Sequence, residues 1–144
     1  MTSKINFKDL VHSFGDGVVI SDGAGTIIYW NPSAERVFGF TELEAVGQNL
    51  DLIVPERLRQ RHNEGYDHSM ETGTTRYGDK LLTVPALHKS GKPISIAFTV
   101  TMLFDENHKA CGVAAVIRDD TARFTEERAL KKRVAELETA AKLP

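Results

Sequence analysis

The sequence is short of several features that would mark other classes of protein. Its single cysteine, Cys111, excludes an internal disulfide and any metal site that needs several cysteines. No apolar run approaches the roughly 20 residues that span a bilayer, and the N-terminus lacks the uninterrupted apolar core of a signal peptide. The formal net charge of -2 disfavours a nucleic-acid partner, which requires a basic face. We therefore expect a cytoplasmic protein that binds neither nucleic acid nor a membrane.

Catalytic signatures are also missing. The sequence contains no glycine-rich phosphate-binding loop, no nucleophile elbow and no paired-histidine metal motif, so we expect that the chain is not an enzyme. What the 144 residues do contain, with 41% hydrophobic and 26% charged side chains, is typical of one globular domain with a single core.

Strand-like and helix-like segments alternate in an order that indicates an α+β domain. Residues 17–31 predict a β-hairpin, because two β-rich runs flank a turn that contains Gly and Asp. Three more strands are predicted at 80–88, 93–104 and 112–119, and Pro85 suggests that the first of these lies at an edge or has a bulge. Helices are predicted at 5–14, 33–40, 41–47, 55–73 and from 121 onward. Five antiparallel strands with helices on one face leave room for a cavity between helices and sheet.

Several runs resemble a PAS domain of the bacterial S-box type. They are WNPSAERVFGF at 30–40, the Pro55-Glu56 helix start, the KSGK turn at 89–92 and VIRDDTAR at 116–123. The resemblance covers about residues 7–123 and implies a five-stranded antiparallel sheet, short helices on one face and a C-terminal output helix. It also implies a sensory and dimerisation module used in signal transduction. We expect an N-terminal helix or cap at 1–15, the PAS sensor domain at 16–120 and a linker helix at 121–144.

His62 is the candidate ligand-binding residue. Steps of four residues along the helix predicted at 55–73 connect Leu58, His62, Tyr66 and Met70, which puts an imidazole in an otherwise apolar row. The segment PERLRQRHNEGY is similar to the haem-binding PAS domains of rhizobial oxygen-sensing histidine kinases, in which the histidine at this position binds the iron. The resemblance therefore implies b-type haem on His62 for gas or redox sensing, and a neutral imidazole is a good iron ligand.

The same resemblance assigns further residues to the haem pocket. Gly65 would remove bulk where a flat macrocycle must approach the helix, and Tyr66 would belong to the same wall. Arg76 falls where those sensors place a basic partner for a haem propionate, and arginine pairs well with carboxylates.

The distal side of this pocket departs from the oxygen sensors. They place an Arg on the strand before the KSGK turn, whereas ungapped counting back from Gly91 reaches Leu82. Leu82, Phe98 and Val100 would then line the distal side without a hydrogen-bond donor. If haem binds, carbon monoxide or nitric oxide is easier to accommodate than a stabilised oxygen complex.

Other interpretations stay open at His62. The domain can be a cofactor-free dimerisation or interaction module, in which His62 is a half-buried residue with a backbone hydrogen bond. It can also bind flavin or a small metabolite. A light-driven cysteine adduct on this helix is excluded, because RQRHNEGY stands where flavin-binding light sensors of this fold carry Asn-Cys-Arg-Phe.

The end of the last predicted strand resembles the junction through which PAS domains reach their output. Asp119, Asp120 and Thr121 form this junction, and Asp or Thr can cap the helix that follows. On that helix, the spacing of Leu130, Val134 and Leu137 predicts a short coiled-coil seam and hence a homodimer. The sequence does not identify the effector, because the chain can be a fragment of a larger signalling protein or a stand-alone sensor.

Overall fold

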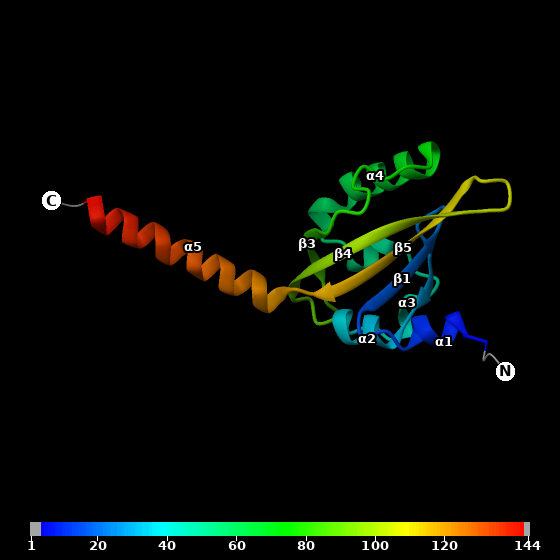
Figure 1. The fold of residues 1–144 in the computed structure, drawn as a ribbon, viewed down its shortest axis with the longest axis horizontal. Helices are drawn as coiled ribbons and strands as arrows, with labels where there is room; N and C mark the ends of the chain where they lie inside the picture. Colours follow the sequence, from blue (N-terminus) through cyan, green and yellow to red (C-terminus); the bar gives the residue numbers. More distant parts are fainter. Residues whose placement is uncertain (1–3, 143–144) are drawn as a thin grey trace.

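Five strands form one antiparallel sheet in the order β2-β1-β5-β4-β3 (Figure 1). The computed structural model describes residues 4–142. The strands are β1 (Gly17–Asp22), β2 (Ile27–Trp30), β3 (Leu82–Leu87), β4 (Pro93–Phe104) and β5 (Ala110–Asp119). The first and last strands pair in the middle of the sheet, so the end of β5 lies beside the start of β1 at the Gly17–Ile117 pair. The predicted five-stranded antiparallel sheet is confirmed, and β3 with Pro85 is an edge strand.

The helices are short except for the two that follow Pro55 and Asp120. They are α1 (Phe7–His12), α2 (Pro32–Phe38), α3 (Glu42–Ala45), α4 (Arg59–Thr72) and α5 (Thr121–Lys142), with 3-10 turns η1 (Leu50–Ile53) and η2 (Glu56–Leu58). The helix predicted from Pro55 therefore begins as a 3-10 turn and becomes α-helical at Arg59. None of the described helices is both long and apolar enough to cross a membrane.

Local sequence signals explain where α2 and α3 begin and end. Asn31 caps α2, Pro32 occupies its first turn, and Gly39 ends it in the left-handed conformation with φ of 82°. Thr41 and Glu44 form a reciprocal capping box at the start of α3. These two short helices are therefore fixed in place by their ends as well as by burial.

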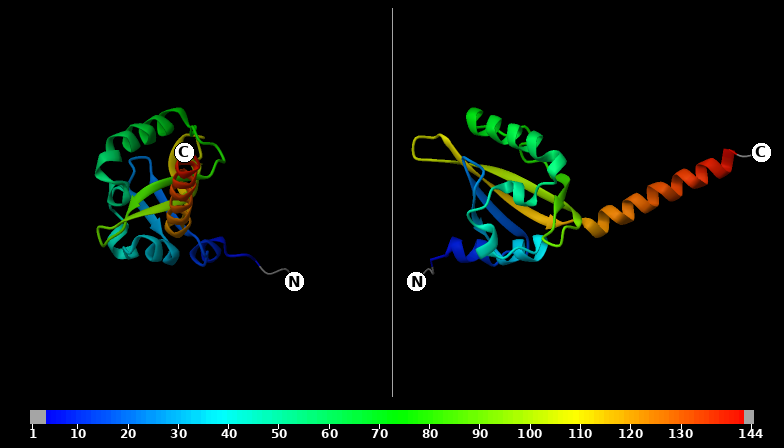
Figure 2. Two further views of the ribbon diagram at one scale, coloured as in Figure 1. Left: turned by 90° about the vertical axis from the view of Figure 1, so that its left-hand side faces the viewer. Right: turned by 180° about the vertical axis from the view of Figure 1, so that it is seen from behind.

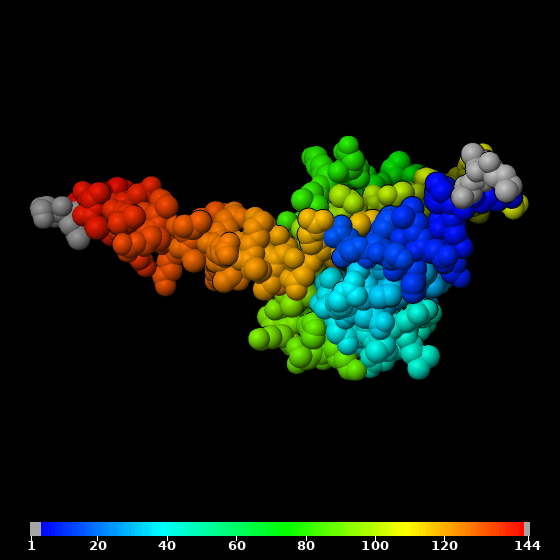
Figure 3. Space-filling model, turned by 60° about the horizontal axis from the view of Figure 1, so that its bottom comes forward, coloured from blue at the N-terminus to red at the C-terminus, as the bar shows by residue number. Residues whose placement is uncertain are grey.

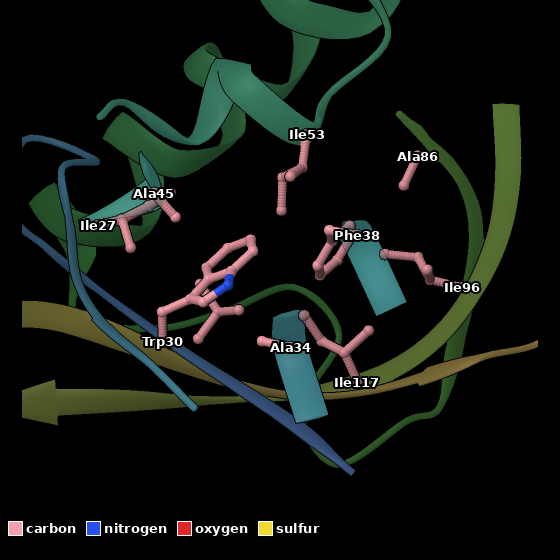
Figure 4. Packing of buried hydrophobic residues seen from close by; sticks show 10 residues of the cluster. Ile27, Trp30, Ala34, Phe38, Ala45, Ile53, Ala86, Ile96 and Ile117 are labelled. Atoms are coloured by element: carbon pink, nitrogen blue, oxygen red, sulfur yellow. The ribbon is translucent and has the colours of Figure 1, made fainter. Parts of the chain in front are cut away.

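The core lies between one face of the sheet and the helices α2 and α3 (Figure 4). Trp30 and Phe38 are its largest fully buried side chains, with ring centroids 5.2 Å apart. The indole nitrogen of Trp30 donates a hydrogen bond of 2.9 Å to the carbonyl of Phe40, so its polar atom is satisfied inside the core. Ile96 and Ile117 contribute from the sheet.

Helix α5 leaves the domain at the end of β5 and projects away from it (Figures 2 and 3). No residue of α5 is buried, and its charged side chains form ion pairs three or four residues apart, such as Lys131 with Glu127. Helix α4 also has no fully buried residue, although it lies over the sheet.

Candidate functional site

Helix α4 positions His62. The segment reaches it through Pro55 and the turn η2, and Gly73 ends it in the left-handed conformation by donating its amide to the Ser69 carbonyl. The row predicted to face inward, Leu58, His62, Tyr66 and Met70, is half-buried along its whole length. Because α4 has no fully buried residue, the apolar and aromatic side chains on its sheet-facing side are partly open to solvent.

A hollow of about 220 Å³ lies beside His62. Its walls come from α4, from the turn between β1 and β2 and from the start of η1. The lining residues are Ala24, Gly25, Asn49, Leu50, His62, Asn63, Tyr66 and Asp67. The lining is mostly polar, and the volume is below the approximately 300–1,000 Å³ of sites for drug-sized ligands. As shaped, this hollow suits a small polar molecule or one edge of a larger ligand.

One nitrogen of the His62 ring makes no hydrogen bond within the described chain. Its Nδ1 lies 3.5 Å from the Oδ1 of Asn63, which is a long contact, and its centroid is 6.2 Å from that of Tyr66. Within residues 4–142, Nε2 of His62 has no hydrogen-bond partner. A half-buried imidazole with an unengaged nitrogen can donate or accept a hydrogen bond, or bind one metal centre.

Tyr66 joins α4 to the sheet. Its hydroxyl donates to the backbone carbonyl of Asp22 at 2.5 Å and lies 2.9 Å from the Oγ of Ser21, which is buried in β1. Burial raises the pKa of Tyr66 above the ordinary value for a phenol, against the lowering effect of the Ser21 hydrogen bond. The sequence placed Tyr66 in the ligand wall, where it does line the hollow, but gave no signal for these partners.

The three residues predicted for the distal side of the pocket lie on β3 and β4. Leu82 and Phe98 face each other across β3 and β4, and both are half-buried, as is Val100. Phe98 packs against the core cluster. None of the three lines the hollow at His62 within the described chain.

Gly65 and Arg76 are both exposed. A Cβ on Gly65 would have no described atom within 4 Å, so this side of α4 is open. Arg76 lies beyond the end of α4, with its guanidinium carbon 5.6 Å from the ring centroid of Tyr77. No carboxylate in residues 4–142 forms an ion pair with Arg76.

The junction between β5 and α5 is tied to β4 at Ser95. The amide of Asp120 donates to the Ser95 carbonyl at 2.7 Å, and the Ser95 amide donates to Oγ1 of Thr121 at 3.0 Å. The side chain of Asp119 accepts from the amide of Thr121. Arg123 then makes two hydrogen bonds to the Asp120 carboxylate, which holds the pKa of that carboxyl below its usual range.

The predicted seam residues are exposed on α5. Leu130, Val134 and Leu137 are 66%, 52% and 53% exposed, on the part of the helix that projects from the domain. Large apolar side chains at this spacing have no partner within the described chain.

The family model of the PAS fold matches residues 6–119. The chain belongs to the PAS family. An uncharacterised protein of Azorhizobium caulinodans is 31% identical to it over 121 residues, which are 81% of this chain and 16% of that protein. The sensor protein FixL of Bradyrhizobium diazoefficiens is 39% identical over 62 residues, 43% of this chain and 12% of FixL. The oxygen sensor protein DosP of Escherichia coli is 25% identical over 111 residues, 77% of this chain and 14% of DosP.

Solved structures share the fold of this PAS domain at lower identity. The PAS domain of a Colwellia psychrerythraea protein has a TM-score of 0.70 at 22% identity, covering 81% of this chain and 95% of that one. An RNA-binding light-oxygen-voltage receptor has a TM-score of 0.71 at 14% identity, covering 90% of this chain and 36% of that one. The matched regions make up only 12% to 16% of the three curated relatives, so the domain corresponds to a small part of each.

Proposed function

We propose that this PAS domain is a sensor that binds its ligand between α4 and the sheet and passes the signal to α5. The leading ligand is haem b, held through His62 for gas or redox sensing. One observation carries this proposal: His62 is half-buried in a hollow, with one ring nitrogen unengaged, on a helix whose inner row is nowhere fully buried.

The donor chemistry near His62 fits a haem. Haem needs a single axial side chain from the protein, and residues 4–142 contain no group of three His, Cys, Asp or Glu side chains that could hold a metal ion alone. A porphyrin also needs apolar walls, which Leu82, Phe98 and Val100 would provide from the core side of the sheet, where Phe98 packs against the core cluster. When bound, haem supplies an iron that binds diatomic gases or changes oxidation state.

The residues of this chain have distinct roles in the proposal. His62 holds and orients the ligand through its unengaged nitrogen. Leu82, Phe98 and Val100 exclude water from the opposite side, and none of them can donate a hydrogen bond. Arg76, which has no ion-pair partner in the described chain, is free to pair with a ligand carboxylate.

Similarity to known sensors supports a sensory rather than a catalytic role. FixL and DosP are named as a sensor protein and an oxygen sensor protein, and both align with this domain. The apolar Leu82, in place of an arginine, favours carbon monoxide or nitric oxide over oxygen as the signal.

The test is the absorption spectrum of the protein expressed with haem supplied. We expect a Soret band that is lost in His62→Ala and retained in His68→Ala, because His68 is an exposed histidine of the same helix. A protein that stays colourless under these conditions refutes the haem proposal.

A second candidate function is favoured by the size and polarity of the hollow. At about 220 Å³, with Asn49, Asn63 and Asp67 around His62, the hollow can hold a small metabolite without a porphyrin. This candidate would be supported instead if the protein is colourless, a small polar compound raises its melting temperature, and the same compound does not raise the melting temperature of His62→Ala. Homodimerisation through Leu130, Val134 and Leu137 is compatible with both candidates, and with a domain that binds no cofactor.

A further inference from the structure

Helix α4 is joined to the sheet by the hydrogen bonds of one side chain. Within residues 4–142, the other side-chain hydrogen bonds of α4 stay inside the helix or reach the segments next to it, such as Arg59 to the Val54 carbonyl. None of the described ion pairs involves α4. The hydroxyl of Tyr66 is the exception, since it bonds to two groups of β1.

The direction of these hydrogen bonds follows from the groups involved. The Asp22 carbonyl can only accept a hydrogen bond, so the Tyr66 hydroxyl donates its single proton to this carbonyl. The Ser21 hydroxyl must then donate to the Tyr66 oxygen, 2.9 Å away. We call these three groups the Tyr66 latch.

The sheet side of the latch is held by the pairing of β1 with β5. Ser21 is 2% exposed and pairs with Val113 of β5. The next pair is Asp22 with Gly112, where a Cβ on Gly112 would overlap the Ser21 carbonyl oxygen. The Asp22 carbonyl also accepts the Gly25 amide at 3.0 Å, which fixes the turn that forms one wall of the hollow.

The helix side of the latch carries His62 one turn away. His62 and Tyr66 lie four residues apart, on the same face of α4, with their ring centroids 6.2 Å apart. Because α4 buries no residue fully, apolar packing alone holds it weakly.

We propose that the Tyr66 latch sets the position of α4 over the sheet, and that Tyr66 is thereby the positioning residue for His62. Opening the latch lets the inner row of α4 move away from the turn at 22–25. The effect on ligand affinity rests on the proposed function, whereas the effect on α4 itself does not.

Hydrogen exchange of α4 tests the latch without any ligand. Tyr66→Phe keeps the ring and removes the hydroxyl, and Ser21→Ala removes the second partner. We expect amides 59–72 to exchange about five- to tenfold faster in both variants. Amides of β4 and β5 should keep their wild-type rates. Tyr77→Phe is the matched control, since the Tyr77 hydroxyl makes no hydrogen bond in the described chain.

The outcomes separate clearly. Exchange in α4 that is unchanged in Tyr66→Phe overturns the latch, as does an acceleration spread evenly over the whole domain. Haemin titration adds the readout for positioning, and we expect about fivefold weaker binding in Tyr66→Phe, with Tyr77→Phe unchanged. Equal haemin affinity in both variants overturns the positioning role. If the wild-type protein binds no haemin, the haem proposal fails, and the exchange rates of α4 still decide whether the latch exists.

Discussion

The side-chain oxygen of Asn31 accepts a hydrogen bond of 2.8 Å from the amide of Val18, so the N-cap of α2 also fixes the start of β1. The same oxygen accepts from the amide of Ala34, and the side-chain nitrogen donates to the carbonyls of Val11 and Asp16. One fully buried amide therefore joins the N-terminal segment, the first strand and the first helix of the core.

Replacing Asn31 should destabilise the domain severely. Asn31→Ala removes the side-chain hydrogen bonds of four backbone groups, so we expect the free energy of unfolding to fall by about 3 kcal/mol or more. Urea denaturation measures this change. Asn49→Ala is the matched control, because Asn49 is an exposed cap whose side chain, within residues 4–142, accepts only from the Asp51 amide. This variant should cost about 1 kcal/mol. Equal losses in the two variants would contradict the central role of Asn31.

Two glycines should respond to alanine in opposite directions. A Cβ on Gly112 would overlap the Ser21 backbone, and we expect Gly112→Ala to cost about 1–3 kcal/mol in urea denaturation. Gly65 lies inside α4 with open space around it, so Gly65→Ala should stabilise the ligand-free domain by about 0.5–1 kcal/mol.

Gly65→Ala also bears on the haem proposal. If a macrocycle approaches α4 at this residue, the variant should bind haemin more weakly than the wild type while its ligand-free form is more stable. Haemin titration beside urea denaturation separates the two effects. Unchanged haemin binding would mean that the macrocycle does not pack against Gly65.

The stability contributed by the Asp120–Arg123 ion pair at the N-terminal end of α5 should fall in acid. The hydrogen bonds from Arg123 hold the pKa of Asp120 below its ordinary value. When the pKa of a carboxyl is lower in the folded state than in the unfolded state, the ionised carboxylate stabilises the fold at pH values above the ordinary aspartate pKa. This contribution is lost as the pH falls through the lowered pKa. Asp120→Asn should therefore be less stable than the wild type at neutral pH, and the difference should shrink in acid.

Urea denaturation between about pH 7 and pH 3 checks this prediction. Asp79→Asn is the control, since the Asp79 carboxylate makes no ion pair in the described chain. Some acid sensitivity should remain in Asp120→Asn, because Lys89 and Lys131 lower the pKa of Glu44 and Glu127. A difference between wild type and Asp120→Asn that is the same at every pH would refute the assignment.

The seam on α5 should control the oligomeric state. Leu130→Gln with Leu137→Gln removes two apolar side chains that are already more than half exposed in the single chain, so the core of the domain should stay intact. We expect a dimeric mass for the wild type and a monomeric mass for the double variant by light scattering. Lys132→Gln, which lies off the seam, should stay dimeric. A wild-type monomer at high concentration would remove the basis for the seam.

The sequence predicted most of the fold because its signals are local. Pro32, Gly39 and the Thr41–Glu44 capping box define helix ends through contacts within a few residues, and the structure shows each of them. Alternation along 93–104 correctly predicted β4, the longest strand. The edge position suggested by Pro85 is also confirmed.

The site was less accessible to such signals because it depends on distant contacts. The four-residue row on α4 indicated correctly that His62 and Tyr66 face the same way. The partners of Tyr66, however, lie 44 and 45 residues away in sequence, on a strand whose position is set by the whole sheet. Asn31 is similar: the Asn-Pro pair predicts a helix start, but nothing local predicts its bonds to Val11, Asp16 and Val18.

Helix α5 has the geometry of a long arm that is held at one end. Its 22 residues, at about 1.5 Å of rise each, make an arm of about 33 Å, and its anchorage is confined to the first residues around Ser95 and Thr121. A tilt of about 10° at that fulcrum would displace the far end of such an arm by about 6 Å. A shift at Ser95 too small to alter the core would therefore become a displacement of about one helical turn at the other end of the arm.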